Sequence, residues 1–385
     1  MNEIKIVAEK SPHLRRKDSL SRMLLDVIIA LAPVVICSVV FYSYQAAINI
    51  GLSCLMMCLC EFIYTLIRYH IPYDGNKHSF KEHYNEAMKH YSVNNILAPC
   101  VSGIIFALIL PSTCEPIYFI YLTIIFGSIF GIVIGKLVFG GNGNNIFNPA
   151  AVGMVFAKIC FGSHFKYLVP DSFNVTTGGT ILTGLNGFAV PSGHNSLTGK
   201  FLYINQVSVL DMFLGKYSGV MGETFKIAIL IGLIYLLIRR AIDFRIVVSY
   251  FGMFTLLMAL AGIIICSREN IDFFRFMGFQ ILSGGFLFGL TYMATDPVTC
   301  PINPPGRIIY GLILGVITVI IRLFGALPEG VIYSILIGNM ISPFIDYPSW
   351  SGSRYSKGKL ICMGCIAAIS LLVVGLGIGF GGNLV

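Results

Sequence analysis

The chain has 385 residues, of which 56% are hydrophobic and 11% charged, and its formal net charge is +8. Soluble domains usually carry about 25% charged residues, so this composition excludes a soluble enzyme, a disordered chain and a nucleic-acid-binding protein. Runs of about 20 uncharged apolar residues form helices that cross a hydrocarbon core about 30 Å thick. The sequence therefore predicts an all-α polytopic membrane protein. The charge-free runs are Val27–Cys60, Ile117–Gly135, Ile246–Cys266, Phe276–Thr295 and Leu360–Val385.

The positive charges predict which loops are cytoplasmic, because Lys and Arg concentrate in short loops on that side of the membrane. Four basic groups flank the apolar runs, and they fall in the segments 15–22, 68–89, 239–245 and 354–359. The mostly polar stretch from Gly162 to Glu223 contains only three lysines. We therefore expect that stretch to be external.

The apolar segments divide the chain into about ten predicted membrane helices. They are Leu24–Tyr42, Ala46–Arg68, Leu97–Leu110, Ile117–Val138, Phe225–Ile238, Ile246–Cys266, Met277–Met293, Ile308–Phe324, Gly330–Ile345 and Leu360–Gly379. Several are only 14 to 16 residues long and end at Asn, Pro and Gly clusters. Short, interrupted segments at matching places in two halves indicate broken helices that meet near the middle of the membrane.

Two such places match. A glycine-rich helix runs into an Asn/Pro hinge at Gly127–Gly153 and into an Asp/Pro hinge at Ser283–Gly306. We predict two related, inverted repeats with broken helices. The expected divisions are a cytoplasmic segment 1–21, a first repeat 22–162 with a cytoplasmic insertion 71–95, an external loop 163–222, a second repeat 223–346, and a C-terminal loop and helix 347–385.

The first hinge is a candidate binding site. Non-helical backbone at membrane depth must line a cavity or be covered by protein, and Asn144, Asn145 and Asn148 add amide groups there. These amides suit a planar polar ligand such as the edge of a flavin ring. Equally, the asparagines can serve only to cap the broken helices.

Carboxylates in or beside apolar segments are the second kind of candidate, since ionisable groups inside a membrane are costly. Asp296 and Asp346 each end an apolar run beside a proline, so they can also act as interfacial caps. Glu61 lies well inside its run and needs water, a cation or a partner. The five acids of this kind are Asp26, Glu61, Asp296, Glu329 and Asp346.

Five ordered motifs resemble one family. The chain is similar to the D subunit of the Rnf ion-translocating electron-transport complex, and to its relative, the B subunit of the sodium-pumping NADH:quinone reductase. The short segment before the first helix favours the Rnf type. The motifs are Ser11–His13 with Met23–Pro33, Gly143–Ala150, Ala294–Thr299, Pro328–Val331 and Pro343–Asp346.

The resemblance implies two flavins. Flavin mononucleotide (FMN) is attached in this family by a phosphoester to a threonine of an external loop, and Thr177-Gly178-Gly179-Thr180 is similar to that motif, with Thr180 as the acceptor. Asn174 and Gly179 stand where the family has Asp and Ala. A non-covalent riboflavin contacts two hinge asparagines, which match Asn145 and Asn148.

The resemblance also implies an ion route and partners. Glu61, Asp296 and Asp346 match family acids implicated in cation movement. The expected function is a flavin-carrying bacterial inner-membrane subunit of a redox-driven Na⁺ or H⁺ pump, which relays electrons between flavin and iron–sulfur subunits from ferredoxin to NAD⁺. The chain shows no nucleotide-binding loop and no iron–sulfur cysteine cluster. Alternatives are the quinone-reductase type of subunit and a stand-alone small-solute channel or transporter.

Overall fold

The computed structural model describes residues 20–69, 71, 80–141, 143–167, 208–269, 272–325, 329–347 and 355–381, and its architecture there is almost entirely helical. Thr177, Gly178 and Thr180, together with Asn174 and Gly179, lie outside these described residues. The two short strands β1 (Thr113–Cys114) and β2 (Phe165–Lys166) pair antiparallel. They connect the segment just before the predicted helix Ile117–Val138 to the start of the predicted external loop 163–222.

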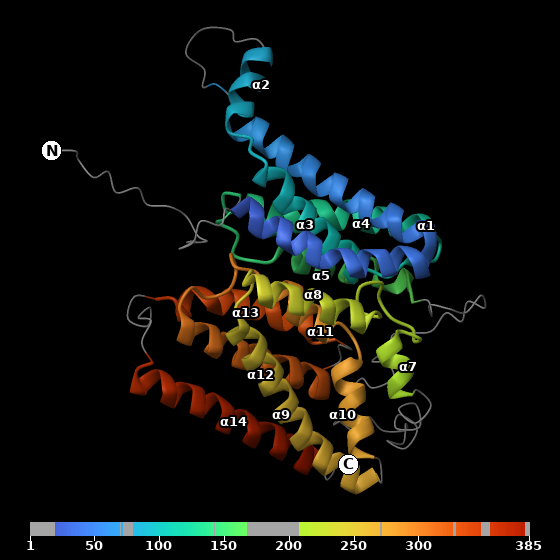
Figure 1. Cartoon of the computed structure of the whole chain (residues 1–385), viewed down its shortest axis with the longest axis vertical. Coiled ribbons are helices and arrows are strands. Elements are labelled where there is room, and N and C mark those ends of the chain that lie inside the picture. Colours follow the sequence, from blue (N-terminus) through green and yellow to red (C-terminus); the bar gives the residue numbers. More distant parts are fainter. Residues whose placement is uncertain are drawn as a thin grey trace, which may run out of the picture.

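The first helix region is a hairpin rather than one rod. Helix α1 (Leu20–Arg68) contains a non-helical Ser43, with φ 62° and ψ −161°, and the chain reverses direction there (Figure 1). The two halves correspond to the predicted helices 24–42 and 46–68. Both halves leave large apolar side chains exposed, for example Val40 at 70% and Ile67 at 67%. Such outward faces are expected of helices that meet lipid.

The remaining helices form two groups that Figure 1 shows one above the other. In the first group, α1 packs on α3 and α4, and α4 packs on α5. In the second, α9 packs on α10, α12 and α14, while the contacts of α1 with α8 and of α5 with α13 connect the groups. The first group has α2 (Phe80–Lys89), α3 (Asn94–Ile109), α4 (Tyr118–Ile132), η1 (Val133–Leu137), α5 (Pro149–Phe161) and η2 (Gly162–His164). The second has α7 (Val209–Leu214), α8 (Lys226–Arg239), α9 (Phe244–Glu269), α10 (Phe273–Leu282), α11 (Phe286–Phe288), η4 (Gly289–Met293), α12 (Pro304–Phe324), α13 (Val331–Ile345) and α14 (Lys357–Gly381).

Five described helices are long and apolar enough to cross a membrane, or seven if each of two bent helix pairs counts as one span. The structure is thus an all-helical, multi-span membrane protein, whereas the count of ten spans stays a prediction. Within the predicted insertion 71–95, residues 80–89 form the mostly exposed helix α2.

Both predicted hinges are non-helical in the structure, and a further break at residues 283–285 lies inside the predicted helix Met277–Met293. Helices α10 and α11 meet at an angle of 54°, and Gly284 at the break has φ 64°, which glycine adopts without steric cost. Helix α4 ends in the π-helical turn η1, and the chain then crosses a loop to the start of α5. The π-helical turn η4 likewise precedes the loop that leads into α12.

Candidate functional site

The site is a cavity at the junction of the two helix groups. It has a volume of about 100 Å³. Apart from Ser102, the side chains from α1 and α3 are apolar, whereas η1, η4 and the two hinges contribute amide, hydroxyl and charged groups. The lining residues that carry polar side chains are Ser102, Lys136, Asn145, Asn148, Thr291, Tyr292, Thr295 and Asp296.

A second cavity adjoins the first. Its volume is about 590 Å³, and it shares Met23, Ala241, Ile242, Thr295 and Pro297 with the smaller one. Pockets for organic ligands usually measure about 300–1,000 Å³, so the small cavity alone is narrow for a three-ring flavin. The two cavities together offer enough room, and the larger one reaches the arginines of the α8–α9 loop and of α12.

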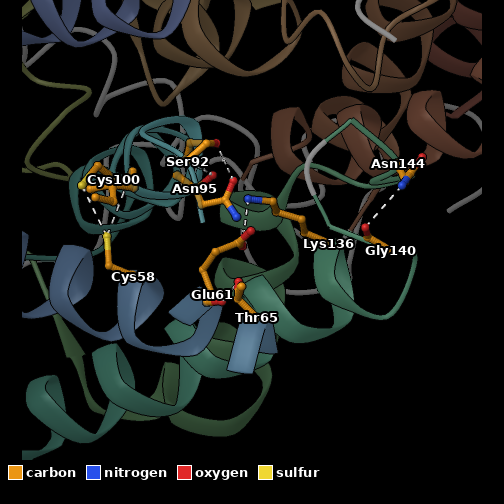
Figure 2. A network of polar contacts seen from close by, with 12 residues as sticks. Cys58, Glu61, Thr65, Ser92, Asn95, Cys100, Lys136, Gly140 and Asn144 are labelled. Atoms are coloured by element: carbon orange, nitrogen blue, oxygen red, sulfur yellow. Dashed lines mark hydrogen bonds and ion pairs between the residues drawn. The ribbon is translucent and has the colours of Figure 1, made fainter. Parts of the chain in front are cut away.

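The hinge asparagines have different roles in the structure. Asn148 caps α5, because its Oδ1 accepts hydrogen bonds from the backbone N–H groups of Ala150 at 3.0 Å and Ala151 at 3.4 Å. Its amide NH₂ is the group that remains to meet a ligand. Asn145 lines the cavity without belonging to a helix. Asn144 donates to the Gly140 carbonyl at 3.3 Å and stabilises the turn (Figure 2).

Close packing of α4 on α5 fixes the position of this hinge. A Cβ atom on Gly131 would lie 2.6 Å from the Pro149 carbonyl oxygen, and one on Gly153 would lie 2.7 Å from the Gly127 carbonyl oxygen. Only glycine allows the two backbones to approach so closely. The Asn148–Pro149 start of α5 is thereby held against the last turns of α4.

Glu61 has a partner that the sequence analysis did not identify. The Lys136 Nζ atom in η1 lies 3.0 Å from Glu61 Oε2, and both side chains are almost fully buried, at 4% and 3% exposed (Figure 2). Lys136 also lines the cavity and interacts electrostatically with Asp296. The signal in the sequence is a single lysine inside the predicted helix Ile117–Val138, which is costly in a membrane unless paired.

Asp296 and Asp346 each accept hydrogen bonds from the loop that leads into α12. Asp296 Oδ1 accepts the Val298 backbone N–H at 3.2 Å, and its Oδ2 accepts the Thr299 hydroxyl at 3.3 Å. Asp346 Oδ2 accepts the Ile302 N–H at 2.8 Å, and its Oδ1 accepts from Asn303 Nδ2 at 2.7 Å. Asp296 faces the cavity, but Asp346 lies behind the loop that enters α12. The structure thus gathers Asn145, Asn148 and Asp296 around one cavity, joins Glu61 to it through Lys136, and leaves Asp346 outside.

A scan of protein families settles the relationship of the chain. The model described as the NQR2, RnfD, RnfE family matches residues 7–351. This chain belongs to that family. The resemblance inferred from the five motifs is confirmed by this match.

Individual relatives are consistent with the family. The B subunit of the Na(+)-translocating NADH-quinone reductase of Chromohalobacter salexigens is 36% identical over 253 residues, which cover 64% of this chain and 57% of that protein. The corresponding B subunit of Ectopseudomonas mendocina is 36% identical over 257 residues. The D subunit of the ion-translocating oxidoreductase complex of Alcanivorax borkumensis is 29% identical over 357 residues, or 89% of this chain and 94% of that protein. The chain therefore aligns with little more than half of the quinone-reductase relatives but with nearly all of the oxidoreductase-complex relative.

Proposed function

We propose that this family member is the flavin-carrying membrane subunit of a redox-driven Na⁺ or H⁺ pump in a bacterial inner membrane. One observation carries the proposal: hinge amides, a loop carboxylate and a buried Lys–Glu pair, distant in sequence, meet at one cavity between the helix groups. A site of this composition can hold a planar polar cofactor beside a charged path. The relative from the Alcanivorax oxidoreductase complex aligns over nearly its whole length, which favours the Rnf type over the quinone-reductase type.

Asn145 and the free amide NH₂ of Asn148 would hold the non-covalent flavin, riboflavin, at the polar wall of the cavity. The apolar side chains of α1 and α3 would cover the ring and exclude water. A bound flavin supplies the electron-transfer chemistry, while the protein supplies position and electrostatics. Thr180, within the Thr177-Gly178-Gly179-Thr180 motif, would carry FMN as a phosphoester.

Glu61 and Asp296 would form the inner part of the cation route, with Lys136 as the resident counter-charge. Asp346 would support this route by holding the loop that follows Asp296. Glu61→Gln is therefore expected to keep the flavins and to raise the cation concentration needed for half-maximal turnover. Electrons would pass through partner flavin and iron–sulfur subunits between ferredoxin and NAD⁺.

The repeat interpretation is part of the same proposal. Each half contains a π-helical turn, a loop, and a helix that begins at an Asn-Pro pair, namely Asn148–Pro149 and Asn303–Pro304. Two inverted repeats built in this way would place both loops at the same depth. This plan is shared by stand-alone transporters, so the presence of flavin separates the two functions.

One experiment tests both flavins. The purified protein is denatured, and flavin released into solution is measured separately from flavin that stays on the polypeptide. Thr180→Ala should abolish the retained flavin and the corresponding added mass, whereas Thr177→Ala should preserve both. Retained flavin in Thr180→Ala would exclude that attachment site.

The flavin released on denaturation tests whether the hinge asparagines bind the non-covalent flavin. A buried hydrogen bond left unmade costs about 1–3 kcal/mol, so Asn145→Ala should weaken retention of the non-covalent flavin roughly ten- to a hundredfold. Asn148→Asp keeps the oxygen that caps α5 and removes the NH₂ donor, so it separates the ligand role from the capping role. Unchanged released flavin in both variants would place the pocket elsewhere. No flavin of either kind in the wild type would favour a transporter.

A further inference from the structure

A second group of buried charges surrounds the break between α10 and α11, away from the cavity described above. Its four members are Glu223, Lys226, Arg322 and Glu329, which are 4%, 0%, 6% and 9% exposed. They come from the residues around the start of α8, the last turn of α12 and the residue two before α13. None of the four lines the cavity of the candidate site. Buried charges at this density require a specific arrangement of partners.

The two cations stabilise the carbonyl end of the break. Arg322 donates from Nη1 to the Gln280 carbonyl at 2.6 Å and from Nη2 to the Ser283 carbonyl at 3.2 Å. Lys226 donates to the Gly284 carbonyl at 3.2 Å and also to the Glu223 backbone carbonyl. Positive charge is favourable at a helix C-terminus, where carbonyl groups lack helical partners. Both cations are thus fixed by the backbone of the break.

The two carboxyl groups meet on the amide side of the same break. Glu329 Oε1 accepts the Gly285 backbone N–H at 3.3 Å, and Glu223 Oε1 accepts the Val220 N–H at 3.0 Å. Glu223 Oε2 lies 3.5 Å from the position of a Cβ atom built on the same Gly285, so both carboxyl groups lie against this glycine. Two ionised carboxylates that share one buried site repel each other, so their proximity favours one proton shared by the pair.

A small cavity lies between the two acids. Its volume is about 10 Å³, and Glu223, Glu329 and Gly285 line it together with Leu108, Phe288 and Met293. That volume is close to what a single water molecule requires. One water beside the two carboxyls could take up and pass on the shared proton.

The small cavity and the candidate site lie along the same two elements. On α3, Ile105 lines the cavity of the candidate site, and Leu108, about one turn further, lines the small cavity. On α11–η4, Tyr292 lines the cavity of the candidate site, and Phe288, about one turn earlier, lines the small cavity. The π-helical turn η4 (Gly289–Met293) spans the distance between them. The small cavity lies near Gly222, whose N–H bonds the Leu108 carbonyl, at the end of the predicted external loop 163–222.

We propose that the Glu223–Glu329 carboxyl pair is a proton-binding site in the outer half of the protein, with Lys226 and Arg322 as its fixed counter-charges. When the O–H bond of the shared proton breaks, the proton passes to the water, and both oxygens keep their electron pairs as carboxylates. The four side chains then carry no net charge, since two carboxylates balance two cations. The place of this site on an ion route rests on the proposed function, but the shared proton itself does not.

Other titratable groups act on the pair from the elements packed around it. Besides Lys226 and Arg322, they are Tyr42 of α1, Tyr167 after β2, Tyr217 before α8 and Tyr333 of α13. The Tyr217 hydroxyl donates to the Glu223 backbone carbonyl at 3.0 Å. The phenols stay neutral when the pair exchanges its proton, so the carboxyls are the groups that change charge.

Infrared spectroscopy of the purified protein tests the proposal. The wild type should show a carbonyl stretching band of a protonated carboxylic acid that shifts in D₂O. Glu223→Gln and Glu329→Gln should each remove the intensity that belongs to the pair. Glu115→Gln, a change at a side chain that is 72% exposed, should leave the spectrum unchanged.

Glu329→Asp is the second variant, because it keeps the charge and withdraws the carboxyl by one methylene from Glu223. It should also lose the band while the protein remains folded and monodisperse. A wild type without the band, or a band that persists in all three variants, would overturn the proposal. Flavin content, measured on the same samples, reports separately on the candidate site, so a failure of either assignment can be recognised.

Discussion

Lys136 is the buried partner that balances the charge of Glu61 inside the protein. Its ammonium group neutralises Glu61 at 3.0 Å in a place where both side chains are almost fully buried. The same lysine lines the cavity with Asn145, Asn148 and Asp296. It therefore connects an acid of α1 with the two hinges, which the linear order of the motifs does not reveal.

Removing one member of a buried pair leaves an uncompensated charge and typically costs about 3–5 kcal/mol. Lys136→Met is therefore expected to lower the thermal unfolding midpoint strongly. The double variant Glu61→Gln/Lys136→Met removes both charges and should recover most of that loss. Thermal unfolding in detergent measures both effects.

The exposed pair of Lys89 and Glu86 provides the control for this comparison. Its Nζ–Oε2 distance is 2.6 Å, but the side chains are 67% and 39% exposed. Lys89→Met should leave the midpoint unchanged, because water and salt screen such a pair. Equal midpoints for Lys136→Met and the double variant would mean that the buried pair is not the cause.

The sequence identified the candidate residues but could not assign their roles. Asn148 caps α5 through its Oδ1 and also lines the cavity, so the capping role is observed while the ligand role stays a prediction. Asp346 binds a loop instead of facing the cavity. Such choices depend on which backbone groups come within about 3 Å in the folded protein, and that is not encoded in the spacing of residues. The flavin-bearing threonine stays a prediction, since it lies outside the described residues.

At the scale of helices, the two hinges could be predicted but the form of the breaks could not. Clusters of Gly, Asn and Pro predict the non-helical hinges, whereas the break at 283–285 lies inside the predicted helix Met277–Met293. The π-helical turns η1 and η4 have no comparable local signature. Such turns are frequent at functional sites, and residues of both turns line the cavity.

The glycines between α4 and α5 give a prediction at this scale. Gly131→Ala should separate the two helices and destabilise the protein, because the new methyl group would lie 2.6 Å from the Pro149 carbonyl oxygen. It should also reduce non-covalent flavin, since Asn148 precedes Pro149. Thermal unfolding and released flavin are the two measurements.

Gly252 in α9 is the matched control, because nothing lies within 4 Å of a Cβ built there. Gly252→Ala should be neutral or stabilising by up to about 1 kcal/mol, as alanine favours a helix over glycine. If Gly131→Ala behaved in the same way, close helix contact would not hold the hinge in place.

At the scale of the whole molecule, the order of helices was largely predictable and the membrane topology less so. Ten predicted segments correspond to helical regions, yet α8 with 14 residues and α13 with 15 are too short to cross about 30 Å at 1.5 Å per residue. Hydropathy detects that a segment is apolar, whereas crossing depends on how neighbouring helices cover its ends. The predicted orientation therefore needs a direct test.

Labelling of single cysteines provides that test. In a variant without the native cysteines, Glu86→Cys on the exposed face of α2 should react with a membrane-impermeant maleimide only in inverted vesicles. Ser163→Cys, in η2 at the start of the predicted external loop, should react only from the outside of intact cells. Labelling of both positions from the same side would contradict the predicted topology.

If Glu61 lies on the proposed cation route, the Glu61–Lys136 pair would determine how this protein responds to membrane voltage. A paired acid and base have no net charge, so the electric field of the membrane exerts no net force on them while they stay together. A cation that takes the place of the ammonium group brings a unit charge into that field, worth about 2.3 kcal/mol per 100 mV over the full membrane. Voltage dependence would therefore arise in the exchange of lysine for cation, and it would be measurable as a transient current before any electron reaches the flavin.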